Sequence, residues 1–176
     1  MIVALTQIDA RRGFVVEREL DEQVLDAMLE GYLGYHAACP ASYKLRLAQA
    51  GKGVALSGRL ACTLSAPCRR CLDEVQQSLE LELDVMLLPS TDLGTEEERE
   101  LNADELDTTF FDNGEINLNE ILRESIVLEL EPYLQCREDC AGLCAGCGVN
   151  LNRESCTCPP KAVDPRWQCL VESKRS

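Results

Sequence analysis

The clearest pattern in the chain is a strict alternation of apolar and polar positions between residues 42 and 88. Three stretches within it keep their apolar side chains on one parity, at 43–47, 54–64 and 75–87. The opposite parity of the third stretch carries acids such as Glu80 and Glu82. A period of two is typical of strands that bury one face, and Gly51-Lys52-Gly53 supplies a tight turn between the first two stretches. The pattern predicts an antiparallel β-meander with one wet side.

Two other segments space their apolar residues as amphipathic helices do. The first follows Asp21, a helix-capping residue type, ends at Gly31 and has its apolar positions at Val24, Leu25, Met28 and Leu29. The second follows Asn117, has Glu120 in capping-box position and forms one face from Leu118, Ile121, Leu122, Ser125 and Ile126. We also predict strand, turn and strand within residues 1–20, and a strand over 108–111. The fold class that follows is α+β, an antiparallel sheet with a few short helices.

At 176 residues and 45% hydrophobic content, the chain can build one packed core and a small appendage. Residues 1–134 carry the periodic patterns and are predicted to form the α+β domain. Residues 135–176 are rich in cysteine and poor in periodic apolar sequence, so we expect a zinc-ribbon-like tail that needs a staple. The longest apolar run is four residues, far below the ~20 of a membrane helix. No basic start precedes an apolar stretch, which argues against a secretory signal, and we expect a cytoplasmic protein.

The charge balance is strongly acidic, with 31 acids against 17 bases and a formal net charge of −14. A general electrostatic grip on nucleic acid needs a broad basic face, and this chain has no surplus of bases to build one. Half of the net charge lies between Asp92 and Asp107, where eight acids accompany one base. We expect residues 89–107 to form a solvated acidic loop, with a docking site for a basic partner as the alternative.

Eleven cysteines are the unusual feature of the composition. An odd count without an export signal argues against a closed disulfide scaffold, and favours metal ligands or redox thiols in a reducing compartment. The chain has one histidine, His36, so a large metal site would consist mainly of thiolates. We expect His36 on the surface, and Cys39, Cys62 and Cys169 as packing residues, since Cys62 falls on the apolar parity of its strand.

The other eight cysteines form four closely spaced pairs, Cys68-x2-Cys71, Cys136-x3-Cys140, Cys144-x2-Cys147 and Cys156-x-Cys158. Two thiolates with two residues between them can reach one tetrahedral ion from a tight turn, and structural zinc takes four such ligands. We predict one site from Cys68, Cys71, Cys136 and Cys140, and a second from Cys144, Cys147, Cys156 and Cys158. Cys156-x-Cys158 has one residue fewer between its cysteines than Cys-x2-Cys, so one of the two could be a bystander. A single ion is therefore an alternative. A redox dithiol is the alternative for Cys68 and Cys71.

The two predicted sites connect different parts of the chain. The first would tie the tail back to the meander, whereas the second would fold the tail locally and supply folding free energy to a segment without a core. Replacing Cys68 by Ser should then loosen residues 136–140 and leave 144–158 ordered.

Catalysis finds little support in the sequence. A single histidine without a serine or cysteine signature argues against a nucleophilic triad, and no glycine-rich phosphate loop is present. A catalytic zinc keeps an open coordination position, whereas sites made only of cysteine are usually structural. We therefore expect no enzymatic activity.

Several of these segments together carry a resemblance to a known family. They are Cys68 to Leu72, Gly114 to Leu118, the stretch from Cys140 to Asn152, Cys156-Thr157-Cys158 and Asp164-Pro165-Arg166. Over residues 54 to 170 the chain resembles the bacterial YceD family, the large ribosomal RNA subunit accumulation proteins. The resemblance implies a role in processing or accumulation of large-subunit, 23S-type ribosomal RNA without catalysis. It also implies that the paired cysteines bind zinc, as one or two structural ions.

The chain departs from the family pattern in two places. Leu130-Glu131-Pro132, followed by three more residues, stands where the family has Leu-Pro before the first cysteine of the tail. This longer spacer would shift Cys136 relative to its partners. Trp167 is also bulkier than the residue expected after Asp164-Pro165-Arg166.

Two routes to a ribosomal role fit the acidity of the chain. It could contact a ribosomal RNA precursor locally, through Arg69, Arg70, Lys161, Arg166 and Trp167. It could instead be an adaptor for a basic ribosomal or assembly protein, which we favour because phosphate contacts gain mainly from a positive field. We expect no membrane partner and no small-molecule substrate. The alternative function is a zinc- or redox-sensing regulatory protein that binds a basic protein partner.

Overall fold

The computed structural model describes residues 1–90 and 108–159. Six of its strands form one sheet in the order β2–β4–β5–β6–β7, with β3 paired to β5. They are β2 (Phe14–Leu20), β3 (His36–Ala37), β4 (Ala41–Ala50), β5 (Gly53–Pro67), β6 (Glu74–Pro89) and β7 (Thr108–Phe111). A second sheet pairs β1 (Ile2–Ala4) with β8 (Glu115–Asn117). Helices α1 (Glu22–Met28) and α2 (Leu118–Glu129) and a 3-10 turn, Leu5–Gln7, make the architecture α+β.

The centre of the large sheet is the meander that the alternating pattern predicts. β5 pairs antiparallel with both β4 and β6, in a register that places Val54 opposite Leu87 and Pro67 opposite Glu74. Apolar side chains on one face are almost fully buried, among them Leu45, Leu47, Leu56, Leu60 and Leu64. Each such leucine contributes about 2 kcal/mol when it leaves water, so this face supplies much of the core.

Two strand pairings differ from what the local sequence suggests. β7 joins the edge of the sheet parallel to β6, with Met86 opposite Thr108, so the predicted antiparallel sheet is mostly antiparallel but mixed at this edge. A parallel pair needs a connection of a dozen residues or more, and residues 90–107 provide that length. β1 and β2 are the two strands expected within residues 1–20, but β1 pairs with β8 and β2 with β4.

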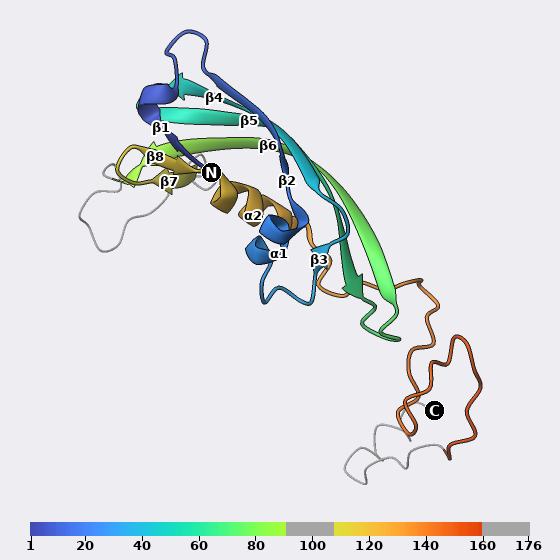
Figure 1. The fold of residues 1–176 in the computed structure, drawn as a ribbon. Helices are drawn as coiled ribbons and strands as arrows, with labels where there is room; N and C mark the ends of the chain where they lie inside the picture. Colours follow the sequence, from blue (N-terminus) through green and yellow to red (C-terminus); the bar gives the residue numbers. More distant parts are fainter. Residues whose placement is uncertain (91–107, 160–176) are drawn as a thin grey trace, which may run out of the picture.

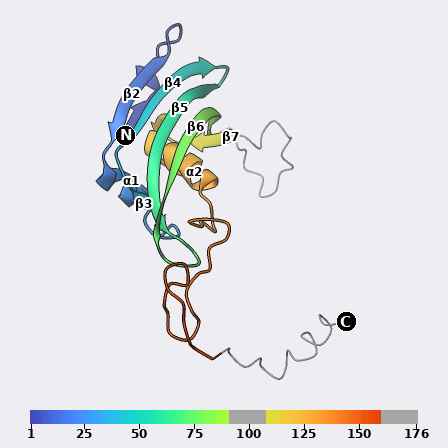
Figure 2. The ribbon, with the colours of Figure 1, turned by 90° about the vertical axis from the view of Figure 1, so that its right-hand side faces the viewer.

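Both helices cover the same face of the large sheet and lie beneath its curve (Figures 1 and 2). α2 buries the predicted face, including Leu122 and Ile126, and begins at Asn117, whose side chain accepts a hydrogen bond from the backbone N–H of Asn119. Asp21 occupies the N-cap position of α1 without a side-chain capping bond. Neither described helix is long and apolar enough to cross a membrane. The opposite face of the large sheet carries polar side chains together with the exposed apolar side chains of Val15 and Met86.

The cysteine-rich tail leaves the sheet at the far end of the β5–β6 hairpin (Figure 1). Leu134 anchors its start, because this side chain is buried and its carbonyl accepts a hydrogen bond from the backbone N–H of Arg69, at 2.9 Å. The division of the chain at residue 134 into two domains stays a prediction.

The cysteines outside the four pairs have different surroundings. Cys62 is buried on its strand, as predicted, whereas Cys39 is exposed, so its expected packing role is wrong. Cys39 follows the two-residue strand β3, which leaves it outside the covered face. His36 is exposed, with Nε2 3.2 Å from a carboxylate oxygen of Glu74.

Several sequence predictions fall outside the described residues. The acidic segment 91–107 is one of them. The others lie in the last part of the chain and are Lys161, Arg166, Trp167 and Cys169.

Candidate metal centres

The first cysteine pair sits in the turn between β5 and β6. The turn is closed by two backbone hydrogen bonds, from Cys68 N–H to the Asp73 carbonyl at 2.8 Å and from Leu72 N–H to the Cys68 carbonyl at 3.0 Å. Leu72 adopts a left-handed φ of 62° to complete it. The backbone N–H of Arg70 then points at Cys68 Sγ, at 3.5 Å. This strand–turn–strand setting is the one that the sequence predicts for a metal-binding knuckle.

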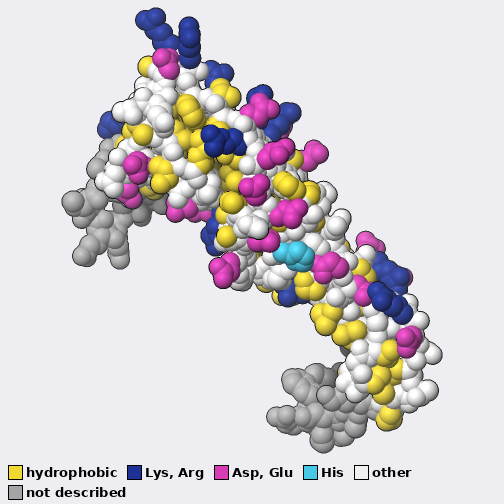
Figure 3. All heavy atoms as spheres, in the orientation of Figure 1, with side chains coloured by type: hydrophobic (Ala, Val, Ile, Leu, Met, Phe, Trp, Pro, Cys, Tyr) yellow, Lys and Arg dark blue, Asp and Glu magenta, His cyan; other side chains and the backbone are white. Residues whose placement is uncertain are grey.

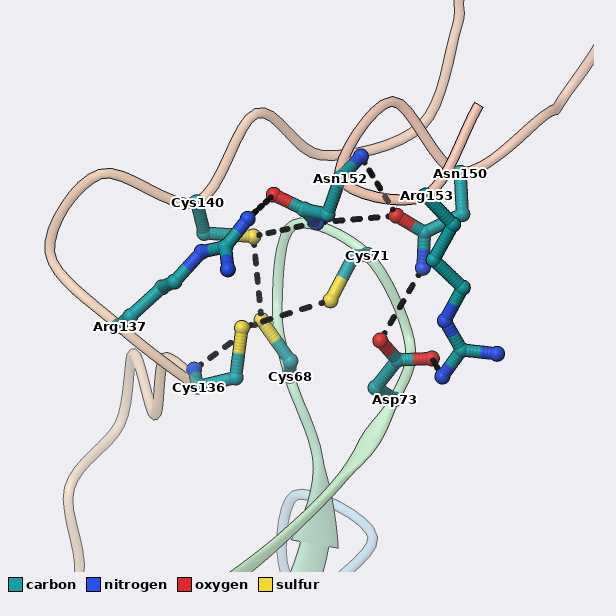
Figure 4. Close-up of polar contacts among 9 residues, drawn as sticks. All are labelled: Cys68, Cys71, Asp73, Cys136, Arg137, Cys140, Asn150, Asn152 and Arg153. Atoms are coloured by element: carbon teal, nitrogen blue, oxygen red, sulfur yellow. Dashed lines mark hydrogen bonds and ion pairs between the residues drawn. The ribbon is translucent and has the colours of Figure 1, made fainter. Parts of the chain in front are cut away.

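The tail brings Cys136 and Cys140 to this turn, and the four sulfurs point toward one another (Figure 4). Cys68 Sγ lies 3.9 Å from Cys140 Sγ, and Cys71 Sγ lies 3.6 Å from Cys136 Sγ. Cys68, Cys71 and Cys140 are buried and Cys136 is exposed. We call these four residues the first tetrad. The longer spacer before Cys136 does not keep it from the group.

The second tetrad consists of Cys144, Cys147, Cys156 and Cys158, whose sulfurs all lie within 4.8 Å of one another. Cys144 Sγ is 3.2 Å from Cys156 Sγ and accepts a hydrogen bond from Gly146 N–H at 3.4 Å. A backbone bond from Gly148 N–H to the Cys144 carbonyl closes this knuckle. The knuckle repeats the arrangement of Cys68 and Arg70, and all four cysteines are half-buried or exposed.

Both tetrads have the four-thiol donor set of a four-coordinate site, and the first also has its spacing, whereas Cys144 Sγ and Cys156 Sγ of the second lie closer together, at 3.2 Å. A tetrahedron with Zn–S bonds of about 2.3 Å has sulfur–sulfur edges of about 3.8 Å, and the measured edges of the first tetrad lie on either side of that value. The eight cysteines fall into the two groups of four that the sequence predicts. Four thiolates suit zinc and also iron. Neither group includes a histidine or a carboxylate, so the arrangement is that of a closed structural site.

Two thiols of the first tetrad and one of the second have a lowered pKa. Burial would raise the pKa of Cys140, but hydrogen bonds from the Asn152 side chain and the Gly142 backbone N–H lower it. Burial alone would raise the pKa of Cys68, but backbone N–H groups of Cys71, Arg70 and Cys136 outweigh it and lower the pKa to about 6. Backbone N–H groups of Cys147 and Gly146 lower the pKa of Cys144 to about 6 in the same way. The turns themselves therefore create the first thiolate of each group.

Four thiols hold their protons more tightly, namely Cys71, Cys136, Cys156 and Cys158. Contacts with the sulfurs of Cys147, Cys156 and Cys144 raise the pKa of Cys158 to about 12. For Cys71, a backbone N–H of Asp73 lowers the pKa, but burial and the other three sulfurs of its tetrad raise it to about 12. Negative charge already present in each group opposes further ionisation, and a divalent cation would remove that opposition.

The basic residues at the first tetrad have unequal roles, and among them Arg69 and Arg70 are the predicted contact residues. The Arg69 guanidinium donates to the Leu33 carbonyl at 2.9 Å, which ties the knuckle to the loop after α1. Arg70 is exposed on the knuckle. Arg153 donates to the carboxylate of Asp73 at 2.8 Å. Sequence reasoning missed Asp73 and Asn152, which hydrogen-bond around the first tetrad. Asn152 stands in the stretch that carries the family resemblance, but its spacing gives no sign of its partner.

Comparison with known proteins identifies the family. Residues 56–172 match the family described as Large ribosomal RNA subunit accumulation protein YceD, and the matched range contains all eight cysteines of the tetrads. The chain belongs to the YceD family. No solved structure matches it.

Curated relatives that are similar to the chain come from mycobacteria and from a plant. An uncharacterised protein of Mycobacterium tuberculosis is 34% identical over 128 residues, which is 73% of this chain and 59% of that protein. One of Mycobacterium leprae is 27% identical over 136 residues, 76% of this chain and 58% of that protein. A Zea mays protein named Large ribosomal RNA subunit accumulation protein YCED homolog 1, chloroplastic, is 44% identical over 50 residues, 28% of this chain and 17% of that protein. The chain thus spans about three-fifths of the length of its mycobacterial relatives.

Proposed function

We propose that this YceD-family chain supports the accumulation of large-subunit ribosomal RNA as a non-enzymatic factor, with a structural zinc ion in each tetrad. The observation that carries the proposal is the family match over residues 56–172, which includes both tetrads. All ligands are thiols, so a bound ion has no open position for a substrate. A reducing compartment such as the cytoplasm keeps such thiols available.

The zinc ions would join the tail to the sheet and shape it. The first tetrad links the turn after β5 to a segment 72 residues further on, as the pair Cys68 and Cys140 shows. The tail has few buried apolar side chains beyond Leu134 among the residues described. Metal binding would therefore provide the folding free energy that packing does not supply there.

The helix-free face of the large sheet favours a basic partner. Lys44 pairs with Glu17 at 2.7 Å and Arg59 pairs with Glu82 at 2.9 Å, so these two bases are already neutralised, whereas Arg46 in the neighbouring row is exposed. The four paired residues stand opposite one another across β2, β4, β5 and β6. Such a row leaves little positive field for phosphate groups.

The next row of the same face is acidic at both ends. Glu19 lies opposite Ser42, and Ala61 lies opposite Glu80, so two carboxylates flank a floor of small side chains. They line a groove of about 790 Å³, and neither carboxylate forms an ion pair within the described residues. The other charged residues that line the groove are Glu17, Glu82, Arg18, Lys44 and Arg59. In the view of Figure 3, which also includes the side of the helices, acidic side chains lie along the middle of the molecule with basic ones among them. We infer that the chain holds a basic ribosomal or assembly protein, not an RNA directly.

A pull-down of tagged full-length chain from its host at low salt tests this function. We expect large-subunit assembly proteins and ribosomal RNA precursors in the bound fraction, with the proteins retained after RNase treatment. Glu19→Lys with Glu80→Lys should abolish protein capture, whereas Arg70→Ala should not. Loss of all partners on RNase treatment and in Arg70→Ala would instead establish direct RNA binding. Recovery of neither ribosomal RNA nor assembly proteins would overturn the proposed role.

One observation favours a second function, that of an oxidant sensor. The second tetrad is half-buried or exposed, and backbone N–H groups keep the pKa of Cys144 low, at about 6. Exposed thiolates of low pKa are the thiols that oxidants attack first. Zinc release at low micromolar peroxide, reversed by a dithiol reductant, would support a sensor, and retention of both ions would exclude it.

A further inference from the structure

The turn between the two cysteine pairs of the second tetrad packs against the first tetrad. Residues 150–153 follow Cys147 and precede Cys156 in the chain. Their side chains nevertheless hydrogen-bond to residues around Cys68 and Cys140 (Figure 4). One short segment is therefore part of the surroundings of both tetrads.

Asn152 makes the most direct of these contacts. Its Nδ2 donates to Cys140 Sγ at 3.3 Å, while its Oδ1 accepts from the backbone N–H of Ala141 at 2.8 Å and from Arg137 at 2.7 Å. A hydrogen bond to a thiolate sulfur stabilises the charged form and fixes the direction of its lone pairs. Asn152 therefore positions a predicted ligand of the first tetrad from within the loop of the second.

Asp73 fastens the same turn to the first knuckle. Its carboxylate accepts from Asn150 Nδ2 at 3.1 Å and from Arg153 at 2.8 Å, and its carbonyl accepts from Cys68 N–H. Asn150 Oδ1 in turn accepts from both N–H groups of Asn152, the backbone one and the side-chain one. The four polar side chains form one connected network between the knuckle and the turn.

Backbone contacts reinforce this network. Leu151 N–H donates to the Gly142 carbonyl at 2.9 Å, and Leu143 N–H donates to the Arg70 carbonyl at 3.0 Å. The backbone of the tail thus lies directly on the knuckle at Gly142, where an added Cβ would stand 3.0 Å from the Arg70 carbonyl oxygen. Ordering the first tetrad consequently orders the turn.

We propose that the 150–153 turn couples the two metal centres, so that an ion in the first tetrad raises the affinity of the second tetrad, with Asn152 as the positioning residue. The inference rests on the metal binding in the proposed function. Eight residues separate Cys147 from Cys156, and fixing the turn among them removes much of the conformational entropy that binding at the second tetrad would otherwise cost. The coupling is reciprocal, because linked binding equilibria must be. This coupling replaces the earlier expectation that Cys68→Ser leaves residues 144–158 ordered.

A cycle of zinc titrations on the metal-free full chain tests the coupling, with a chromophoric chelator as competitor and a reductant present. Cys71→Ser disables the first tetrad, and we expect it to weaken the second about tenfold in the natural background. In the Asn152→Ala background, which still binds two ions, Cys71→Ser should change the second affinity less than twofold. Cys136→Ser is a second disabling variant, because Cys136 is exposed and its loss leaves core packing intact.

Two further variants separate a contact on sulfur from a merely structural role. Asn152→Asp keeps the oxygen that accepts from Ala141 and Arg137 but removes the donor to Cys140, and it should weaken the first centre at least tenfold, as lost ligand-supporting hydrogen bonds typically do. Asn119→Ala is the matched control, since this residue lies in α2, and it should change neither affinity.

The outcomes are distinct. If the natural chain binds two ions and the zinc affinity of the second tetrad is unchanged by Cys71→Ser and Cys136→Ser, the coupling is overturned. The proposed metal centres are then still supported. Fewer than two ions in the natural chain would overturn the metal centres and the coupling with them. Equal zinc affinity of Asn152→Asp and the natural chain would remove Asn152 from the mechanism.

Discussion

Each tetrad consists of four cysteine thiols, but the two tetrads are held in place by different parts of the chain. The first joins sulfurs that are 65 to 72 residues apart, and three of its four cysteines are buried at the end of the meander. The second gathers cysteines from one stretch of 15 residues, and all of them are half-buried or exposed. The sheet therefore holds the first tetrad in place. The second tetrad is held by its own knuckle and by the 150–153 turn, which packs against the first tetrad.

This difference shows how a small tail without a core can be built in steps. The long strands β5 and β6 place the first knuckle, and the sulfur contacts and Leu134 place the start of the tail on it. The 150–153 turn then brings the second set of ligands near its folded geometry. Stability decreases outward from the sheet, since each layer depends on the one beneath it.

The largest effect is expected on removing metal. A structural zinc ion in a thiolate site contributes about 10 kcal/mol of folding free energy, so a chelator with reductant should unfold residues 136–158 and leave β4–β6 protected. Hydrogen exchange followed by mass spectrometry reads both regions in one sample. Equal loss of protection in β5 and in the tail would contradict this separation of the sheet from the tail, as would no change in either.

Matched ligand substitutions should then separate the two tetrads. Cys71→Ser and Cys147→Ser should each leave one bound ion, counted by native mass spectrometry. Cys71→Ser should destabilise the chain by more than about 2 kcal/mol, because it leaves buried thiols without their ion at the end of the meander.

The Cys147→Ser variant serves as the control for that experiment. Its exchange should increase over residues 144–158, while the β5–β6 turn keeps its protection. Equal destabilisation by both substitutions would show that the sheet does not support the first tetrad.

Two glycines allow a finer test of the contact between the tail and the first knuckle. Gly142 and Gly148 have nearly the same left-handed φ, 75° and 76°, so alanine costs about 1 kcal/mol of backbone strain at either. Only at Gly142 would the added Cβ meet the Arg70 carbonyl oxygen; Gly148 has nothing within 4 Å. We expect Gly142→Ala to weaken zinc binding at the first tetrad about tenfold more than Gly148→Ala. Indistinguishable affinities would mean that the close approach is dispensable.

The smallest effect concerns reactivity in the metal-free chain. Because the pKa of Cys144 is lowered to about 6, its thiolate predominates at pH 7 and its alkylation rate should fall as the pH drops through about 6. Burial raises the pKa of Cys62 to about 11, so Cys62 should stay unmodified and serves as the internal control. Peptide mapping after brief iodoacetamide treatment measures both. Alkylation of Cys62 as fast as Cys144 would refute the expectation, and zinc should protect Cys144.

Much of the framework was predictable because its signals are local. Alternation over 42–88 predicts the strands and their buried face, since a side chain's face depends only on its position along the strand. The helix after Asn117 follows from its spacing and its cap. The cysteine pairs are equally local, because a knuckle needs two ligands and the backbone between them.

The parts that sequence reasoning missed depend on distant contacts. The parallel placement of β7 beside β6 and the pairing of β1 with β8 leave no mark within the strands themselves. The same holds for Asp73, whose partners Asn150 and Arg153 lie 77 and 80 residues away. In the sequence, Asp73 is simply an acidic residue after the first knuckle, and nothing near it indicates that it binds Asn150 and Arg153.

By itself, then, the sequence determined the α+β class, the meander, the four cysteine pairs and the acidic character, because each follows from residue type and short-range spacing. Only the tertiary structure decided that the sheet is mixed, that three thiols of one tetrad are buried while those of the other are half-buried or exposed, and that Asn152 reaches from one to the other. Those features arise where long strands carry a turn to a tail more than 60 residues away. Such contacts are selected by the packing of the whole chain and not by any segment of it.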